Sequence, residues 1–379
     1  MKIIALETIP VSVPYSHAER SARVQRGGVS EVVVKLTTDD GLVGWGESCS
    51  GADTASIEAA LRAMAPFVVG RDPWEVEAIA RDVYRTGLWD YRLQTGNFAF
   101  AGIDMALWDL CGKACGQPVY RLFGGALRSE VEYFYYLAAS DPQDVAAQAR
   151  RGVERGYRYF YLKVGVDAPS EEQMLVALRE AAGPEARIRI DANEAWSFAE
   201  AGRLIARWDG LVGLDFVEAP IPAAPLGLMR DLRQRLPCAL CANEGLGGED
   251  AVLRMIESAA ADVLCMSSYW VGTLRRFHTL SQVAHLHGIG VCKHTHGELG
   301  IAAAAAHHIL LTLPNTVAGA QQTASVMADD ILATTLPIAT GPGWGLIEAP
   351  GLGIEIDAAK LERYADAYRR DGQFLPWTA

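Results

Sequence analysis

The chain reads RIRIDAN at residues 187–193, DFVEAP at 215–220 and LCANE at 240–244. Asp191 and Glu218 are 27 residues apart, and Glu218 and Glu244 are 26 residues apart. An interval of this length holds one β-strand, one α-helix and their connections. Successive parallel strands would therefore place these three carboxylates side by side at the carboxyl-terminal edge of one sheet.

The same pattern extends in both directions, because short apolar runs alternate with amphipathic stretches from about residue 129 onward. Eight of these runs are strand candidates: Val131–Leu137, Tyr157–Val164, Arg187–Asp191, Gly213–Glu218, Ala239–Asn243, Val263–Ser267, Gly288–Lys293 and Thr316–Ala320. Eight strands separated by helices predict a parallel (β/α)₈ barrel, an α/β fold whose functional groups collect at the C-terminal ends of its strands.

The N-terminal part has a different pattern, with β-rich alternation followed by helical periodicity. The strand candidates are Met1–Val13 and Val29–Thr37, and the helix candidates are Thr54–Val69, Pro73–Tyr84 and Phe98–Gly112. We predict three parts: an α+β unit over residues 1–125, the barrel over 126–325, and a C-terminal segment over 326–379 that packs back on the first unit.

Composition excludes several classes of protein. Half of the 379 residues are hydrophobic and 21% are charged, which is typical of a globular chain. The net charge of −12 disfavours nucleic acid and anionic lipid as partners. Seven cysteines, an odd number without a spaced framework, favour a reduced cytoplasmic protein. The longest apolar stretch, Gly300 to Leu313, is too short to span a bilayer.

The clustered oxygen ligands predict a divalent metal site. Carboxylates suit Mg²⁺, with Mn²⁺ as an alternative. Each acid alone has a second interpretation, because a carboxylate at the start of a helix is favoured there without any metal. Three acids at the spacing of one strand–helix unit favour the metal interpretation, and Asn193 and Asn243 add amide oxygens at the same strand ends.

A lysine ends the second barrel run, YRYFYLKVG (157–165). Lys163 would reach a pocket there, where burial and a nearby cation would lower its pKa and suit it to general-base work. The alternative is a lysine whose ammonium extends to solvent along an apolar stem. The first predicted role requires the side chain to face the carboxylates.

The seventh run leads into KHTHGE (293–298), where Lys293, His294, His296 and Glu298 are ionisable. Histidine titrates near neutral pH and suits proton transfer. Helix capping and ordinary loop polarity are the alternatives. A cationic segment from Tyr15 to Ser30, predicted as a loop and containing Arg20, Arg23 and Arg26, would close over an anionic substrate, or would simply be solvated.

Longer motifs resemble one known family across nearly the whole chain. TTDDGLVGWGE (37–47) resembles its first hairpin, and AGIDMALWDL (101–110), Gly112-Lys113 and PVYRLFGG (118–125) resemble its most recognisable segment. The family is the mandelate racemase/muconate lactonizing enzyme group of the enolase superfamily. The resemblance implies an α+β capping domain over a modified (β/α)₇β-type TIM barrel, one Mg²⁺, and removal of the proton α to a substrate carboxylate. It also implies a homo-oligomer.

The resemblance assigns roles residue by residue. Asp191 and Glu218 match the first two metal ligands, and either Asn243 or Glu244 is the third. Lys163 matches the second lysine of a K-x-K pair, the base, while Tyr161 replaces the first lysine. Ser267 stands where the related branches have a lysine or an aspartate. His294 matches a histidine whose usual aspartate partner is missing, so Lys293 and His296 are further candidates for proton transfer. The predicted substrate contacts are Tyr161, Asn193, Ser267, Arg20, Arg23, Glu298 and Gln321.

These roles favour a dehydratase that acts on a sugar acid or a related hydroxy acid. Lys163 would take the α proton and His294 would protonate the departing hydroxyl, because a histidine without a partner suits one-way acid work. A racemase, epimerase or cycloisomerase is the first alternative. A degenerate barrel that binds a small acid without turnover is the second, since Tyr161, Asn243 and Ser267 depart from the family pattern.

Overall fold

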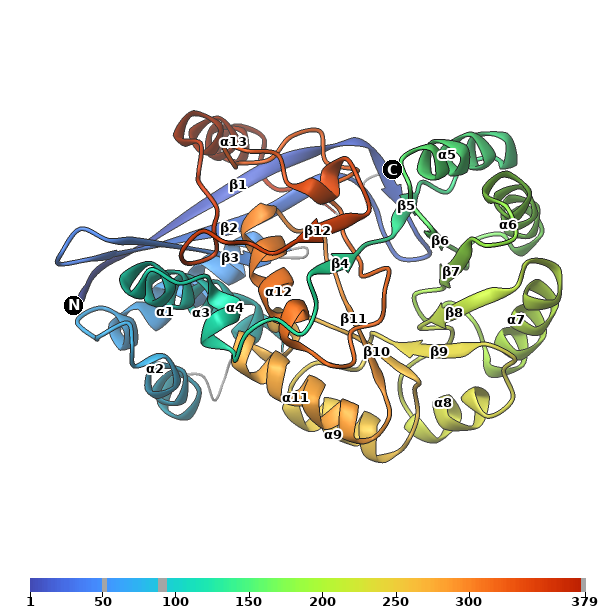
Figure 1. Cartoon of the computed structure of the whole chain (residues 1–379), viewed down its shortest axis with the longest axis horizontal. Coiled ribbons are helices and arrows are strands. Elements are labelled where there is room, and N and C mark those ends of the chain that lie inside the picture. The colour runs from blue at the N-terminus through green and yellow to red at the C-terminus, as the bar shows by residue number, and fades with distance from the viewer. Residues whose placement is uncertain (50–52, 88–93, 376–379) are drawn as a thin grey trace.

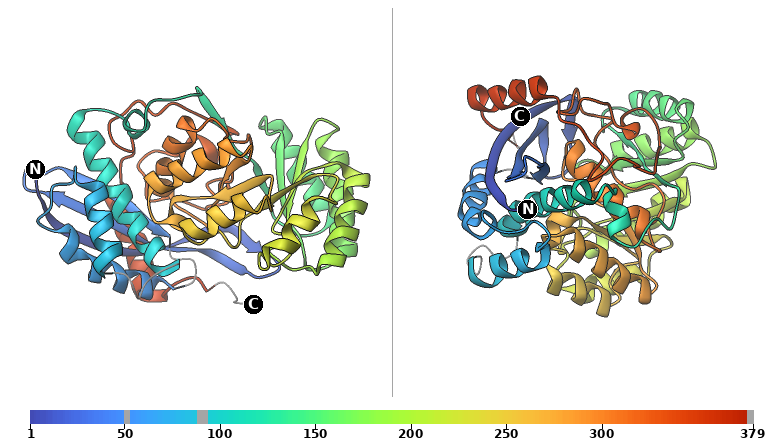
Figure 2. Two further views of the ribbon diagram at one scale, coloured as in Figure 1. Left: turned by 90° about the horizontal axis from the view of Figure 1, so that it is seen from below. Right: turned by 60° about the vertical axis from the view of Figure 1, so that its left-hand side comes forward.

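The computed structural model describes residues 1–49, 53–87 and 94–375. Its N-terminal unit is an antiparallel sheet of β1 (Ile3–Arg20), β2 (Gln25–Thr38) and β3 (Val43–Cys49). The β1–β2 hairpin is long, and its tip lies beside the start of the barrel (Figures 1 and 2). The segment from Tyr15 to Ser30 is therefore mostly strand, and the prediction of a loop there is wrong. Pairing continues past a bulge to Glu19 and Arg26, which lie opposite each other.

Helical segments follow the antiparallel sheet in the chain. They are α1 (Thr54–Val68), α2 (Val76–Asp82), the π-helical turn η1 (Val83–Gly87), α3 (Gln94–Cys115) and α4 (Val119–Leu122). Two glycines set the distance between α3 and β3. A β-carbon added at Gly46 would lie 1.8 Å from the carbonyl oxygen of Gly102, so the helix and strand backbones touch. The two longest motifs of the sequence thus pack directly against each other.

The second unit is a curled parallel sheet of seven strands in sequence order. The strands are β5 (Tyr135–Leu137), β6 (Tyr159–Lys163), β7 (Arg187–Asp191), β8 (Leu214–Glu218), β9 (Ala239–Ala242), β10 (Val263–Met266) and β11 (Gly290–Lys293). The intervening and following helices are α5 (Pro142–Glu154), α6 (Ala168–Ala182), α7 (Phe198–Val212), α8 (Leu226–Arg233), α9 (Glu249–Glu257), α10 (Ser268–Val271), α11 (Leu274–Leu286) and α12 (Gly300–Thr312). Figure 1 shows α5, α6, α7, α8, α9 and α11 along the outer side of the curled sheet. The predicted modified barrel with a capping domain is confirmed.

Local sequence signals begin several of these helices. Asp141 accepts hydrogen bonds from two backbone amides of α5, whose first residue is a proline. Ser197 and Glu200 form a reciprocal capping box at α7. The amphipathic stretches read from the sequence therefore start where capping residues satisfy the first free N–H groups.

The first barrel run differs from its prediction. Residues 131–137 split into β4 (Glu130–Glu132), which pairs antiparallel with β12 (Gly343–Gly345), and β5, which joins the barrel. Val131 lies opposite Trp344. The start of this run therefore pairs with the C-terminal segment and not with a barrel strand. Local periodicity in the sequence does not reveal this pairing.

The eighth run closes the barrel without forming a regular strand. Thr316 bridges Val291 of β11, and Ala320 bridges Tyr133 before β5. Gly319 has a φ of +74°, which takes the backbone out of the extended region. The side chain of Arg189 donates to the carbonyls of Ala318 at 2.6 Å and Gly319 at 2.5 Å. The buried guanidinium of Arg189 thus donates to two backbone carbonyl oxygens that would accept from the N–H groups of a neighbouring strand in a regular sheet.

The C-terminal segment returns to the N-terminal unit. After the 3₁₀ turn η2 (Pro337–Ala339), helix α13 (Ala358–Asp371) lies along β1 (Figure 1). The hydroxyl of Ser12 donates to the carbonyl of Gly372 at 2.8 Å. The domain boundaries at 125 and 325 stay predictions. No helix in the described ranges combines the length and apolar character needed to cross a membrane.

The capping domain is tied to the barrel by buried carboxylates. Glu47 of β3 accepts from the backbone amides of Leu299 at 2.7 Å and Ala302 at 2.9 Å, at the start of α12. Asp104 of α3 accepts from the amide of Leu274 at 2.7 Å, at the start of α11. Negative charge is favoured at both helix N-termini, so these contacts fix the cap relative to the C-terminal half of the barrel.

Candidate active site

A cavity of about 300 Å³ lies where the barrel strands end and the β1–β2 hairpin approaches them. Its lining residues are Glu19, Ser21, Arg23, Val24, Arg26, Lys163, Asn193, Asn243, Glu244, Trp270, His294, Thr295 and His296. The first five come from the capping domain and the rest from the barrel, so the site is built by both units.

Asp191 is the centre of the polar network below this cavity. Its Oδ2 accepts from the Lys163 ammonium at 2.5 Å and from the Tyr161 hydroxyl at 2.6 Å. Its Oδ1 accepts from the backbone amide of Asn193 at 2.8 Å. Strand register produces this arrangement, because Lys163 of β6, Asp191 of β7 and Glu218 of β8 lie side by side.

Glu218 and Glu244 each carry one carboxylate oxygen that has no hydrogen-bond partner among the described residues. Glu218 is fully buried, accepts from the Gln321 amide at 2.6 Å through Oε2, and leaves Oε1 unpaired. Glu244 accepts from the Asn193 amide at 3.0 Å and leaves Oε2 unpaired. Burial, and then the negative charge of Asp191, raises the pKa of Glu218 well above its usual value and the pKa of Glu244 to about 7. Excess negative charge at buried oxygens calls for a cation.

The donor set fits a hard divalent cation. Three carboxylates come from three successive strands, and two of their buried oxygens have no hydrogen-bond partner among the described residues. Asn243 donates its amide N–H to the carbonyl of Cys265 at 3.2 Å, which leaves its side-chain oxygen for another partner. In the described part of the chain, the three carboxylates do not form a group whose oxygens all lie within 4.8 Å of one another.

Lys163 faces the carboxylates rather than solvent, with a side chain 12% exposed. It also donates to the side-chain oxygen of Asn193 at 3.1 Å. Burial lowers the pKa of Lys163, but the carboxylates of Asp191, Glu19 and Glu218 outweigh burial and raise the pKa above its usual value. Asp191 binds the ammonium directly in this arrangement, and the lowered pKa that we expect beside a divalent cation stays a prediction.

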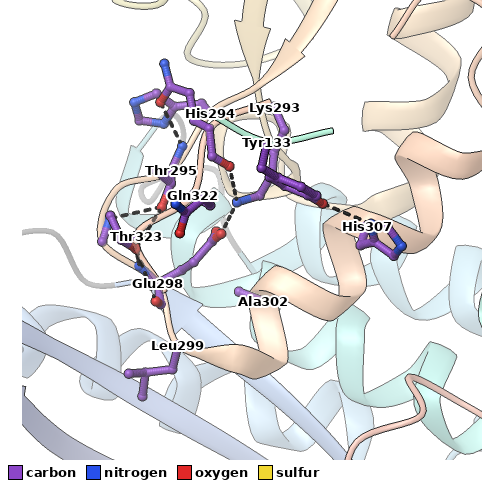
Figure 3. A network of polar contacts seen from close by, with 12 residues as sticks. Tyr133, Lys293, His294, Thr295, Glu298, Leu299, Ala302, His307, Gln322 and Thr323 are labelled. Carbon is purple, nitrogen blue, oxygen red and sulfur yellow. Dashed lines mark hydrogen bonds and ion pairs between the residues drawn. The ribbon is translucent and has the colours of Figure 1, made fainter. Parts of the chain in front are cut away.

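Lys293 is not at the cavity. Its fully buried ammonium pairs with Glu298 and donates to the backbone carbonyl of Gln321 at 3.3 Å. Figure 3 shows the Lys293 side chain directed at Glu298, away from the ring of His294. The backbone amide of Glu298 binds the hydroxyl of Thr323 at 3.3 Å. Lys293 and Glu298 thus hold the loop after β11 to the closing segment.

The two histidines of that loop do line the cavity and lie among aromatic side chains, and His294 is buried while His296 is partly buried. His294 Nδ1 lies 2.6 Å from the hydroxyl of Tyr269, and the backbone carbonyl of His296 accepts from Arg26 at 2.8 Å. Burial, and then the charge of Arg26, lowers the pKa of His296 to about 4. Phe98 packs edge-on against His296 at 5.7 Å.

Charged pairs on the hairpin form the outer wall. Arg26 donates to Glu19 at 2.7 Å, and Arg23 pairs with Glu194 in the loop after β7. Arg20 is exposed and does not line the cavity. Two other predicted substrate contacts bind carboxylates instead: the Tyr161 hydroxyl donates to Asp191, and the Gln321 amide donates to Glu218. Ser267 is buried at the start of α10.

Five residues at or beside the cavity were not predicted from the sequence: Glu19, Ser21, Trp270, Thr295 and Tyr269. Glu19 and Ser21 belong to the segment predicted as a loop, so their position over the barrel was not readable. Tyr269 comes two residues after Ser267, close to the position of the missing acidic partner. This proximity in sequence was the one feature that could have indicated Tyr269. The helix that directs its side chain toward His294 has only four residues, too few to show a helical periodicity.

A capping domain over a barrel whose strand ends carry carboxylates, a lysine and a histidine defines a class of acid–base enzymes. Residues 4–124 match the mandelate racemase / muconate lactonizing enzyme N-terminal domain model, and residues 144–360 match the enolase C-terminal domain-like model. The chain therefore belongs to the mandelate racemase/muconate lactonizing enzyme family of the enolase superfamily, as its motifs predicted, and is an enzyme of the lyase or isomerase type.

Individual relatives are similar over most of the chain. An N-succinyl-L-Arg/Lys racemase from Bacillus cereus is 27% identical over 96% of this chain and 97% of its own length. A cis-3-hydroxy-L-proline dehydratase from Roseibium aggregatum is 30% identical over 81% of this chain and 83% of its own length. A crystal structure of an enolase from Thermobispora bispora, complexed with magnesium and formate, has a TM-score of 0.89 at 26% identity and covers 98% of this chain and 94% of that one.

Proposed function

We propose that the protein catalyses Mg²⁺-dependent removal of the proton α to a small carboxylate, with inversion at that carbon as the overall reaction. The observation that carries the proposal is the placement of Lys163 and His294 at one cavity. They come from β6 and from the end of β11, on either side of the strands that hold the carboxylates. Two proton-transfer groups flanking one enolate are what racemisation or epimerisation requires.

Asp191, Glu218 and Glu244 would hold Mg²⁺ in this proposal, with Asn243 beside them. The ion would bind the substrate carboxylate and offset the second negative charge that develops on proton removal, a pattern for which enolase-superfamily sites with a Lys or His base are a worked case. A cation shared by Asp191 would also weaken the hold of that carboxylate on Lys163. The lysine amine would then be free to take the α proton.

Dehydration of a hydroxy acid or sugar acid is the second candidate. Of the thirteen described residues that line the cavity, eleven are polar or charged, which suits a hydroxylated substrate. The dehydratase from Roseibium aggregatum supports it as well. A histidine without a partner would favour dehydration, but His294 has a partner in the hydroxyl of Tyr269. Cycloisomerisation would share the same first step.

A substrate screen in heavy water tests the proposal. The panel contains both enantiomers of N-succinylated amino acids, hydroxyprolines and sugar acids, each with Mg²⁺, and proton NMR follows exchange of the α proton. Inversion gives the opposite stereoisomer with deuterium at the α carbon, whereas dehydration gives a 2-keto acid that semicarbazide detects. Tight Mg²⁺ binding by calorimetry without exchange of any α proton would instead support the degenerate small-acid-binding barrel.

Two further proposals concern the cellular location and the oligomeric state of the enzyme. All seven cysteines are free, which supports a reducing, cytoplasmic location. The family resemblance supports a homo-oligomer. Light scattering on the purified protein tests the second proposal, and a single species with the mass of one 40.9 kDa chain would contradict it.

A further inference from the structure

His294 has an uncharged partner in a position where an acid is expected. The hydroxyl of Tyr269, on α10, lies 2.6 Å from His294 Nδ1 and 3.1 Å from the backbone carbonyl oxygen of His294. Tyr269 is fully buried and packs against Phe98 at 5.0 Å between ring centroids. Its position is therefore fixed by the core as well as by the histidine.

Counting donors and acceptors assigns the hydrogens of this contact. A tyrosine hydroxyl has one hydrogen, and a carbonyl oxygen can only accept. No other described group donates to the carbonyl of His294, and a buried carbonyl without a donor is costly. All three groups are satisfied when the Tyr269 hydroxyl donates to that carbonyl and accepts from Nδ1–H. Neutral imidazole then carries no hydrogen on Nε2.

The surroundings of His294 disfavour a second ring proton. Burial lowers the pKa of His294 well below its usual value, and His296 of the same loop, Lys163 of β6, Lys293 of β11 and Arg26 of β2 lower it further. No carboxylate is among these groups. An aspartate partner would instead stabilise the imidazolium. The remaining nitrogen, Nε2, has no hydrogen-bond partner in the described part of the chain, and His294 lines the cavity.

We propose that Tyr269 is a positioning residue that takes the place of the missing acid, and that it holds His294 as the neutral tautomer with a bare Nε2 at the cavity, ready to accept a proton. This inference rests on the proposed function and deepens it. His294 would act as a base on the face opposite Lys163, not as the acid that the sequence predicted.

The proton balance of the step is simple. The α C–H bond breaks, its proton bonds to Nε2 of His294, and the electron pair passes into the enolate. An N–H bond of the Lys163 ammonium breaks on the other face, and its proton bonds to the α carbon. One proton enters the enzyme and one leaves it, and the reverse reaction restores both groups. A positively charged His294 at the start would have no site for the first proton.

The test is NMR of the whole protein with ¹⁵N-labelled histidine, because long-range ¹H–¹⁵N spectra separate protonated from bare ring nitrogens. A spectrum of His294→Asn assigns the His294 signals. We expect one protonated nitrogen, Nδ1, and one bare nitrogen, Nε2, with no change between pH 6 and 8.5. In Tyr269→Phe, which keeps the ring and removes the hydroxyl, the single tautomer should be lost and the signals should shift.

The chain offers a matched control in a second buried tyrosine–histidine pair. Tyr133 lies 2.9 Å from His307 Nδ1 (Figure 3), and neither residue is among those that line the cavity. Tyr133→Phe should move the signals of His307 and leave those of His294 unchanged. This control separates loss of a buried hydrogen bond in general from loss of the one that orients His294.

Three results would overturn the inference: a hydrogen on Nε2 with Nδ1 bare, titration of His294 near pH 6.5, or His294 signals that Tyr269→Phe does not alter. If that variant does not fold, the spectra of the wild-type protein across pH still decide the first two. No substrate is needed, so failure of this inference appears in the spectra. Failure of the proposed function would appear separately, as absence of α-proton exchange in the substrate screen.

Discussion

Two lysines end barrel strands in nearly the same way but have different surroundings. Lys163 ends β6, keeps 12% of its side chain exposed and binds Asp191 of the adjacent strand. Lys293 ends β11, is fully buried and binds Glu298, five residues further along its own loop. The first lines the cavity and the second does not.

The difference lies in where each carboxylate comes from. A partner on the adjacent strand keeps the ammonium at the rim, among the other strand-end side chains. A partner on the following loop folds that loop over the ammonium and removes it from the cavity. A lysine at the end of a strand is therefore a candidate base only when its counter-ion is part of the site. A third pair, Lys360 with Asp329 at 2.9 Å, is partly exposed and provides a reference.

The largest expected effect is on catalysis by Lys163→Ala. Loss of a positioned general base should slow α-proton exchange on the lysine face by about 10²- to 10⁴-fold, measured by proton NMR in heavy water with the substrate from the screen. Lys360→Ala, at the exposed pair, is the control and should retain full activity. Full activity of Lys163→Ala would rule out the proposed mechanism.

The next largest effect is on the stability of Lys293→Met. This change leaves the Glu298 carboxylate buried without its cation, which typically costs about 3–5 kcal/mol. Urea denaturation should report that loss in the free energy of unfolding. The double variant Lys293→Met, Glu298→Leu should recover most of it, because replacing both ions removes the unpaired charge. Loss of less than about 1 kcal/mol in the single variant would mean that the pair contributes little.

A smaller effect is expected on metal affinity when the carboxylates are changed one at a time. Glu244→Gln should weaken Mg²⁺ binding by about 10- to 100-fold if Glu244 is the third ligand, since a neutral amide replaces a charged oxygen. Asn243→Ala is the matched variant at the neighbouring position and should have the weaker effect. Isothermal titration calorimetry decides between them, and the reverse order of the two effects would make Asn243 the ligand.

The smallest effect is expected at the partly exposed reference pair, Lys360 and Asp329. Burial raises the pKa of Asp329, but hydrogen bonds from Lys360 and Tyr364 outweigh it and lower the pKa to about 2. A depressed carboxyl pKa adds stability above about pH 4 that is lost as pH falls through about 2. Asp329→Asn should therefore cost about 1 kcal/mol at pH 7, after allowance for screening by solvent, and progressively less as pH falls from 4 to 2. A cost independent of pH, measured by urea denaturation, would assign the effect to packing instead.

The sequence by itself determined the class of fold and the side chains at the centre of the site. Short apolar runs at the spacing of one strand–helix unit require a parallel sheet, and residues that end adjacent parallel strands must meet at one edge. This rule places Asp191, Glu218 and Lys163 at one edge of the sheet, and their strand register agrees with it, although the sequence left open whether Lys163 faces the carboxylates or solvent. The eighth run was less predictable, because Arg189 and Gly319 replace regular pairing there.

Only the tertiary structure decided which residues complete the cavity and which are sealed from it. Glu19 and Arg26 reach the barrel because the β1–β2 hairpin is long, and Tyr269 reaches His294 through one turn of helix. Lys293 is kept out of the cavity by its ion pair with Glu298, which lies on the loop that follows the same strand. These outcomes depend on contacts between segments far apart or on the direction of one side chain. Neither leaves a periodic signal in the sequence, because periodicity reports only which face of an element is buried.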